Sequence, residues 1–161
     1  MQKTLALLAL TLWAVAALAQ PPVAGTLTVA GKPIPLIQVY AWLTESHSGK
    51  QKDDTVVLLA DRPVAAADQR DPFALRRLAA EGKLCFVREI INANGQIVNF
   101  TIGHRAFRIP ASGGSTEHVF DGRHEGQTIS GKVHTRSVQE SFDDIKYEYV
   151  ATFRATVQPK K

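Results

Sequence analysis

The stretch "KLCFVREIINANGQIVNFTIG", residues 83–103, decides the fold class. Two apolar runs lie on either side of Asn94-Gly95, the dipeptide that most strongly favours a tight β-hairpin, usually with a type I′ turn. Strands joined by so short a connection are antiparallel neighbours. The stretch therefore predicts a β protein that is built from hairpins.

Two further segments have the pattern of strands. Residues 146–157, "KYEYVATFRATV", alternate strictly, so that Tyr147, Tyr149 and Phe153 share one apolar face while charged residues occupy the other. Residues 55–61, "TVVLLAD", form a continuous apolar run that is typical of a strand buried on both faces. Eight or so short strands of this kind are expected after the N-terminal segment.

One helix is expected, at about residues 71–81 in "DPFALRRLAAEG". Asp71 is a favourable N-cap, and Gly82 supplies the left-handed residue that ends many helices. The apolar stripe consists of Leu75, Leu78 and Ala79. We expect this helix to cover the edge or open end of the β structure. An anion site at its N-terminus is disfavoured, because Asp71 already places a carboxylate there.

These elements predict a mainly β fold: an antiparallel β-sandwich, immunoglobulin-like in general architecture, with one short covering helix. A closed β-barrel is the alternative. The domain is expected to span residues 20–161.

The N-terminal residues 1–19 are interpreted as a signal peptide. Lys3 precedes an apolar run too short to span a bilayer, and Ala17-Leu18-Ala19 has the small-residue pattern of a cleavage site. The expected product is exported, periplasmic or extracellular, with no stable membrane insertion after cleavage.

Composition excludes several classes of function. The formal net charge is only +4 and the basic residues are scattered, which disfavours a nucleic-acid binder. Cys85 is the single cysteine, so no intramolecular disulfide can form. No motif indicates a cofactor.

Several segments resemble a group of uncharacterised exported β-rich proteins of environmental bacteria. The similar segments are "GTLTVAGKPIPL", "VYA" at 39–41, "DPFALRRLAAEGKL", "ISGKVHT" and "YEYVATFRATV". The resemblance covers about residues 25–157 and implies export and a single β domain. It implies no activity, so no catalytic residue is carried over.

The leading hypothesis for function is a non-catalytic binding or interaction module of the periplasm or cell envelope. Its candidate ligand-binding residues alternate along one face of a predicted strand: Gln38, Tyr40, Trp42 and Thr44. Aromatic and small polar side chains in this pattern can form a platform for a cell-envelope glycan or another exported protein. The competing interpretation places the same face in the core or beneath the helix.

The alternative hypothesis is a small metal-dependent or hydrolytic enzyme that uses His104, His118, His124 and His134. His118 and His124 flank an expected turn at Asp121-Gly122, so their rings could meet across a hairpin and, with His104, bind a metal. Residues 111–118, "ASGGSTEH", lack the spacing of a serine nucleophile elbow.

Overall fold

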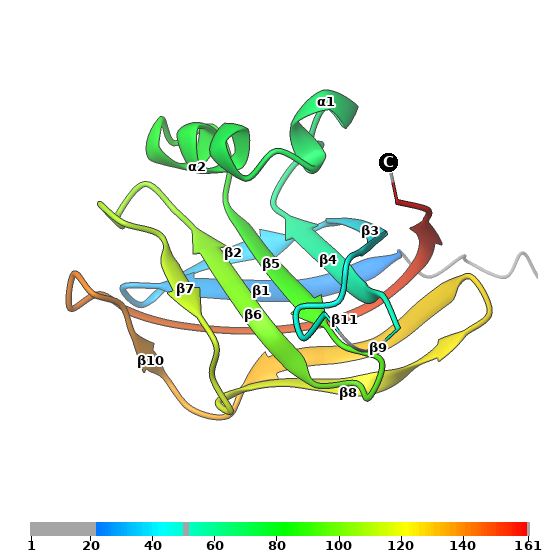
Figure 1. Ribbon diagram of the computed structural model, residues 1–161. Coiled ribbons are helices and arrows are strands. Elements are labelled where there is room, and N and C mark those ends of the chain that lie inside the picture. The colour runs from blue at the N-terminus through cyan, green and yellow to red at the C-terminus, as the bar shows by residue number, and fades with distance from the viewer. Residues whose placement is uncertain (1–21, 50–51, 161) are drawn as a thin grey trace, which may run out of the picture.

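The computed structural model describes residues 22–49 and 52–160, and the predicted signal peptide lies outside them (Figure 1). The chain is mainly β, with two short helices, α1 (Ala66–Gln69) and α2 (Pro72–Ala80). The strands are β1 (Val23–Val29), β2 (Lys32–Leu36), β3 (Gln38–Thr44), β4 (Asp54–Ala60), β5 (Phe86–Ile91), β6 (Ile97–Gly103), β7 (Ala111–Gly113), β8 (His118–Glu125), β9 (Thr128–Thr135), β10 (Gln139–Glu140) and β11 (Lys146–Gln158).

The strands form one curled, mixed sheet in the shape of a half-barrel. β11 lies between β1 and β9, which in turn pair with β2 and β8. The last residues of β11 pair in parallel with β3, Val157 beside Ala41 and Gln158 beside Trp42. From β3 the sheet continues through β4, β5 and β6 to β7.

This topology confirms the mainly β class and corrects its details. The expectation of a purely antiparallel arrangement is wrong, because β3 and β11 are parallel. The sandwich is not confirmed, since the thirteen-residue strand β11 joins the two parts of the curled sheet, β1, β2 and β8–β10 on one side and β3–β7 on the other. It pairs with β1 and β9 over most of its length and with β3 through its last two residues. Within residues 22–49 and 52–160, β7 and β8 do not pair, so the closed barrel is not formed either.

The concave side of the sheet holds the main core. Alternate residues of β11 are buried there, as the sequence pattern predicts, and Tyr149, Ala151 and Phe153 are each almost fully buried. β1, β4 and β5 contribute further apolar side chains to the same core, among them Leu27, Leu59 and Val87.

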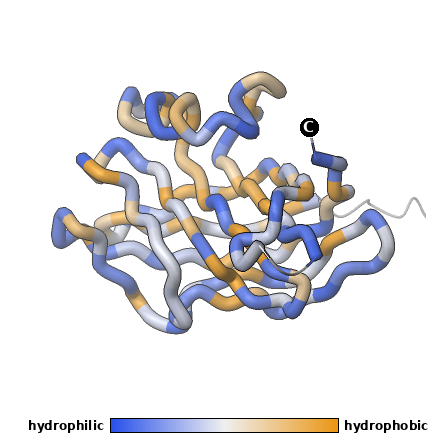
Figure 2. Tube along the Cα trace, viewed as in Figure 1, coloured by the Kyte–Doolittle hydropathy of each residue, from blue (hydrophilic) through white to orange (hydrophobic). Residues whose placement is uncertain are grey.

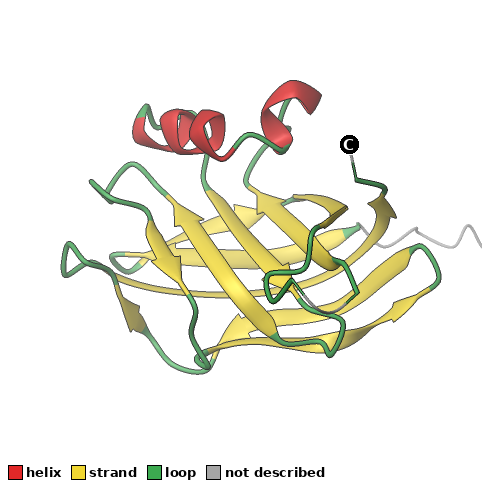
Figure 3. Ribbon diagram, in the orientation of Figure 1, coloured by secondary structure: helices red, strands yellow, loops and turns green. Residues whose placement is uncertain are grey.

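A second, smaller core lies on the convex side, where α2 packs on the sheet and α1 lies next to α2 (Figure 3). Leu75 and Ala79 of α2 pack there with Leu58 of β4 and Phe86 of β5. Burial on both faces explains why every residue of β4 is buried, as the apolar run predicts. The helix therefore covers a face of the sheet. The expectation that it covers an edge or open end is wrong.

The ends of α2 follow the predicted signals. The Asp71 side chain accepts hydrogen bonds from the backbone N–H groups of Phe73 and Ala74. Gly82 has φ +69°, the left-handed conformation that ends the helix. Neither helix in the described part of the chain is long and apolar enough to span a membrane.

The hairpin of β5 and β6 is present, but its turn is not of type I′. A type I′ turn needs positive φ at two central residues, whereas only Gly95 has it at this tip (φ 77°). The Asn92 side chain accepts from the N–H groups of Asn94 and Gln96 and closes a wider loop. Figure 2 shows the hydropathy along the described part of the chain: apolar stretches lie in the strands, and polar residues occupy many of the turns.

Candidate functional site

A chain of polar side chains runs through the main core. Glu89 of β5 points to the concave side and is fully buried, and its Oε1 accepts a hydrogen bond from the hydroxyl of Tyr149 on β11. The Tyr149 hydroxyl lies 2.8 Å from Nδ1 of His118 on β8. The hydroxyl of Tyr147 lies 3.4 Å from Nε2 of the same ring. Three strands that are distant in the sequence are therefore joined by polar contacts inside an apolar core.

The directions of these hydrogen bonds are linked. While Tyr149 donates to Glu89, its oxygen can only accept from His118, so Nδ1 carries the ring proton and Nε2 accepts from Tyr147. When Glu89 is protonated, the same contacts can run in the opposite direction. Either arrangement leaves Oε2 of Glu89 without a partner among the described residues.

Burial favours the uncharged form of every member of the chain. It raises the pKa of Glu89 to about 8, against the opposing effect of the hydrogen bond from Tyr149. It lowers the pKa of His118 to about 4 and raises that of Tyr147 to about 12. Burial first, and then the neighbouring Glu89 carboxyl, raise the pKa of Tyr149 as well. His118 is therefore a neutral imidazole at neutral pH.

An aromatic contact fixes the orientation of His118. Its ring stacks on Phe100 of β6, with ring centroids 3.6 Å apart and an interplanar angle of 15°. β6 and β8 do not pair in the described structure, so this stack is a direct side-chain link between the two parts of the curled sheet.

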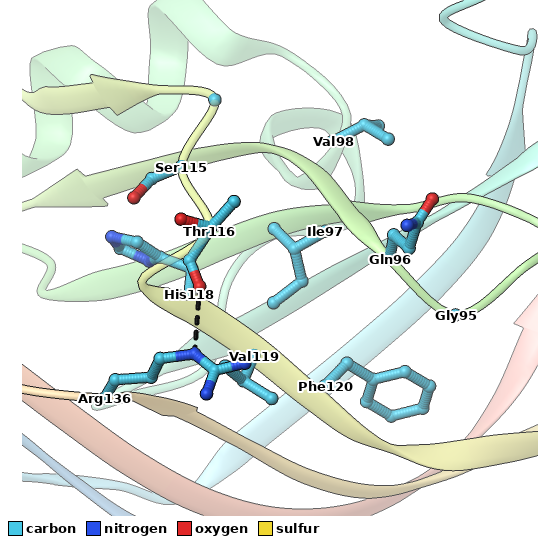
Figure 4. Close-up of a pocket in the computed structure, with 11 residues that line it drawn as sticks. Gly95, Gln96, Ile97, Val98, Ser115, Thr116, His118, Val119, Phe120 and Arg136 are labelled. Atoms are coloured by element: carbon cyan, nitrogen blue, oxygen red, sulfur yellow. Dashed lines mark hydrogen bonds between the residues drawn. The ribbon is translucent and has the colours of Figure 1, made fainter.

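A pocket of about 620 Å³ opens where β6 and β8 remain unpaired (Figure 4). We call it the seam pocket; its lining residues are Gly95, Gln96, Ile97, Val98, Gly114, Ser115, Thr116, His118, Val119, Phe120 and Arg136. Arg136 Nε donates to the backbone oxygen of Thr116 at 3.1 Å and so holds one wall in place. His118 belongs both to this lining and to the buried polar chain.

The predicted aromatic strand face lies on the convex side, next to the helices. Trp42 is only 6% exposed and packs in the second core, with the Arg70 guanidinium 5.6 Å from its ring centroid. The Tyr40 hydroxyl accepts a hydrogen bond from the Val64 N–H. Gln38 and Thr44 are half-buried. Trp42 thus offers almost no ring surface for stacking, and ligand binding by this face stays a prediction.

The four predicted histidines are dispersed. The turn expected at Asp121-Gly122 is wrong, because β8 runs unbroken through both residues. His118 and His124 are six positions apart on this extended strand, or about 20 Å, so their rings cannot meet. Among the described residues no three His, Cys, Asp or Glu side chains are grouped as a metal site would require.

The remaining histidines have other partners. His104 follows β6, and its Nδ1 accepts from the backbone N–H of Ala106. His134 lies on β9, with Nδ1 3.7 Å from the carboxylate of Asp121. His118 contacts two tyrosines, and within the described residues no serine or cysteine hydrogen-bonds to it.

Sequence reasoning missed Glu89 as a site residue. Its signal is a lone acidic residue at an inward position of a strand whose neighbours Val87 and Ile91 are apolar and buried. Cys85, by contrast, lies just before β5 and is half-buried, and burial raises the pKa of its thiol to about 11. That shift is consistent with the predicted role as a small, unreactive hydrophobic residue.

No protein-family model, curated protein or solved structure matches this chain.

Proposed function

We propose that this protein is an exported, non-catalytic binding module whose ligand occupies the seam pocket. The observation that supports the proposal best is the pocket itself, which has the volume typical of small-molecule sites, about 300–1,000 Å³. The signal-like N-terminus supports a location in the periplasm or outside the cell.

The lining of the pocket indicates the chemistry of the ligand. Ile97, Val119 and Phe120 offer apolar contact, whereas Ser115, Thr116 and Arg136 offer hydrogen-bonding groups. A sugar unit has an apolar ring face and a rim of hydroxyl groups, so it matches such a mixed wall. We therefore propose a glycan of the cell envelope as the ligand.

The contacts of His118 support binding over catalysis. A histidine that acts as a base must be within hydrogen-bond reach of the group it activates. Here both ring nitrogens face tyrosine hydroxyls, and Tyr149 connects the ring to a buried carboxyl. The polar chain then serves to hold β5, β8 and β11 in register behind the pocket.

A titration of the labelled protein with soluble cell-wall glycan fragments, followed by amide NMR shifts, tests this proposal. We expect the shifts to concentrate at Ile97, Thr116 and Val119, and the variant Val119→Arg to abolish them by filling the pocket. The matched control is Val150→Arg, at a position 45% exposed on another strand. Shifts that are absent in the native protein, or that persist in Val119→Arg, would contradict the proposal.

A further inference from the structure

A cluster of arginines surrounds two hollows beside α2. The larger, of about 270 Å³, lies between α2 and the loop after β6, and Arg76, Arg77, His104 and Arg108 belong to its lining. The smaller, of about 150 Å³, is lined in part by Arg76 and Arg88. We call the two together the cationic cleft. Among the residues that the structure describes, no acidic one lines either hollow.

The nearby carboxylates are already paired with other cations. Asp143 binds Arg108 at 2.9 Å, and Glu81 binds Lys83 at 2.7 Å. Asp61 binds Arg62 at 2.7 Å. Within the described residues, four guanidinium groups of this region have no hydrogen bond to a carboxylate: those of Arg76, Arg77, Arg88 and Arg105.

Arg88 distinguishes this cluster from an ordinary solvated helix face. Arg76 and Arg77 are exposed on α2, where charged side chains are common. Arg88 instead projects from β5 and is half-buried beside the helix. Burial lowers the pKa of Arg88, and the charge of Arg76 lowers it further, so the two cations are close enough to repel one another. An anion between them would remove this repulsion.

Packing brings Arg105 to the same region. Its Cδ lies 3.2 Å from the position that a Cβ on Gly82 would occupy, so its stem runs along the end of α2. The charge of Arg105 also reaches His104, whose pKa is lowered first by burial and then by Arg105, against a smaller opposing effect of Asp61. Positively charged side chains from α2 and from the loop after β6 therefore lie close together at the larger hollow.

We propose that the cationic cleft binds a small polyanion that carries phosphate or carboxylate groups. A guanidinium presents a planar fork of N–H donors that matches both groups, and Arg76 can reach both hollows. A ligand with two or more anionic groups can engage Arg76 and Arg88 in one hollow and Arg77 in the other. This site is separate from the seam pocket, and neither proposal depends on the other.

Calorimetric titration at low ionic strength tests the site with two probes, inorganic pyrophosphate and citrate. We expect at least one to bind, and added salt to weaken the binding by screening. Arg76→Gln and Arg88→Gln should each weaken it by about tenfold or more, the effect of losing a charged hydrogen bond. Arg154→Gln is the matched control, because it removes the same charge from an exposed position on β11.

Each outcome decides the proposal. Binding of pyrophosphate alone supports a phosphate ligand, binding of citrate alone a carboxylate ligand, and binding of both the shared chemistry. Failure of both probes to bind overturns the site. An equal loss in Arg154→Gln also overturns it, because the affinity would then come from net charge alone. If Arg88→Gln does not fold, the exposed Arg76 still decides between these outcomes.

Discussion

The two cores of this protein lie on opposite faces of the same strands and are built differently. The convex core beneath the helices is a cluster of apolar and aromatic side chains, among them Leu58, Leu75 and Phe86, and the half-buried Arg88 lies beside it. The concave core is also mainly apolar, but the buried chain of Glu89, Tyr149 and His118 passes through it.

The two faces of the sheet are buried in different ways, one by apolar side chains and the other also by hydrogen-bonded polar groups. Apolar side chains contribute by area removed from water and place few demands on direction. Buried polar groups cost free energy unless they are hydrogen-bonded, so the concave core is stable only when β5, β8 and β11 meet in one register. Both cores therefore stabilise the fold through buried apolar area, and the concave core is in addition stable only when its hydrogen-bonding groups are correctly placed.

The largest effect is expected in the convex core. Phe86→Ala should lower the free energy of unfolding by about 3–5 kcal/mol, because it leaves a cavity where the ring packs against Gly103. Urea unfolding measures the loss. Phe73→Ala is the control, because that ring is 79% exposed on α2, and it should change stability by less than about 0.5 kcal/mol. Equal losses in the two variants would show that the helix does not bury the convex face.

A smaller effect is expected in the concave core. Tyr149→Phe should cost about 2–3 kcal/mol, because it leaves both Glu89 and Nδ1 of His118 without a partner. The double variant Glu89→Leu with Tyr149→Phe should recover part of this loss, since an apolar pair replaces an unpaired buried carboxyl. If the double variant is less stable than Tyr149→Phe alone, hydrogen bonding to Glu89 does not explain the cost.

The smallest effect concerns pH. Because burial raises the pKa of Glu89 from 4.5 to about 8, the folded state binds its proton more tightly, and stability falls as pH rises between these values. His118 acts in the opposite sense between about pH 4 and 6.5, since its pKa is lowered and the unfolded state binds the proton more tightly. The two effects offset each other up to about pH 6.5. A net loss on the order of 2 kcal/mol should follow between pH 6.5 and 8.

Unfolding curves measured from pH 4 to 9 give this profile. Glu89→Gln should abolish the loss above pH 6.5 and leave a stability that rises from pH 4 to 6.5. His118→Phe should instead leave a decline that begins near pH 4.5. A native profile that stays flat from pH 6.5 to 8 would mean that Glu89 is ionised throughout that range.

The sequence by itself predicted the local structure. Alternation in residues 146–157 identified β11 and its buried face, and the apolar run at 55–61 identified a strand covered on both sides. Asp71 and Gly82 marked the two ends of α2. These predictions hold because period-two burial and helix capping depend on residues only a few positions apart.

Only the tertiary structure decided how the strands associate and which side chains meet. The parallel contact of β3 with β11 made one curled sheet of the expected sandwich, and the unbroken β8 separated His118 from His124. Glu89 and Tyr149 are sixty positions apart, and the residues next to each of them in the sequence do not predict that the two side chains meet. Pairing at that distance depends on the whole topology of the sheet, because local periodicity fixes the face on which a residue lies but not the strand it faces.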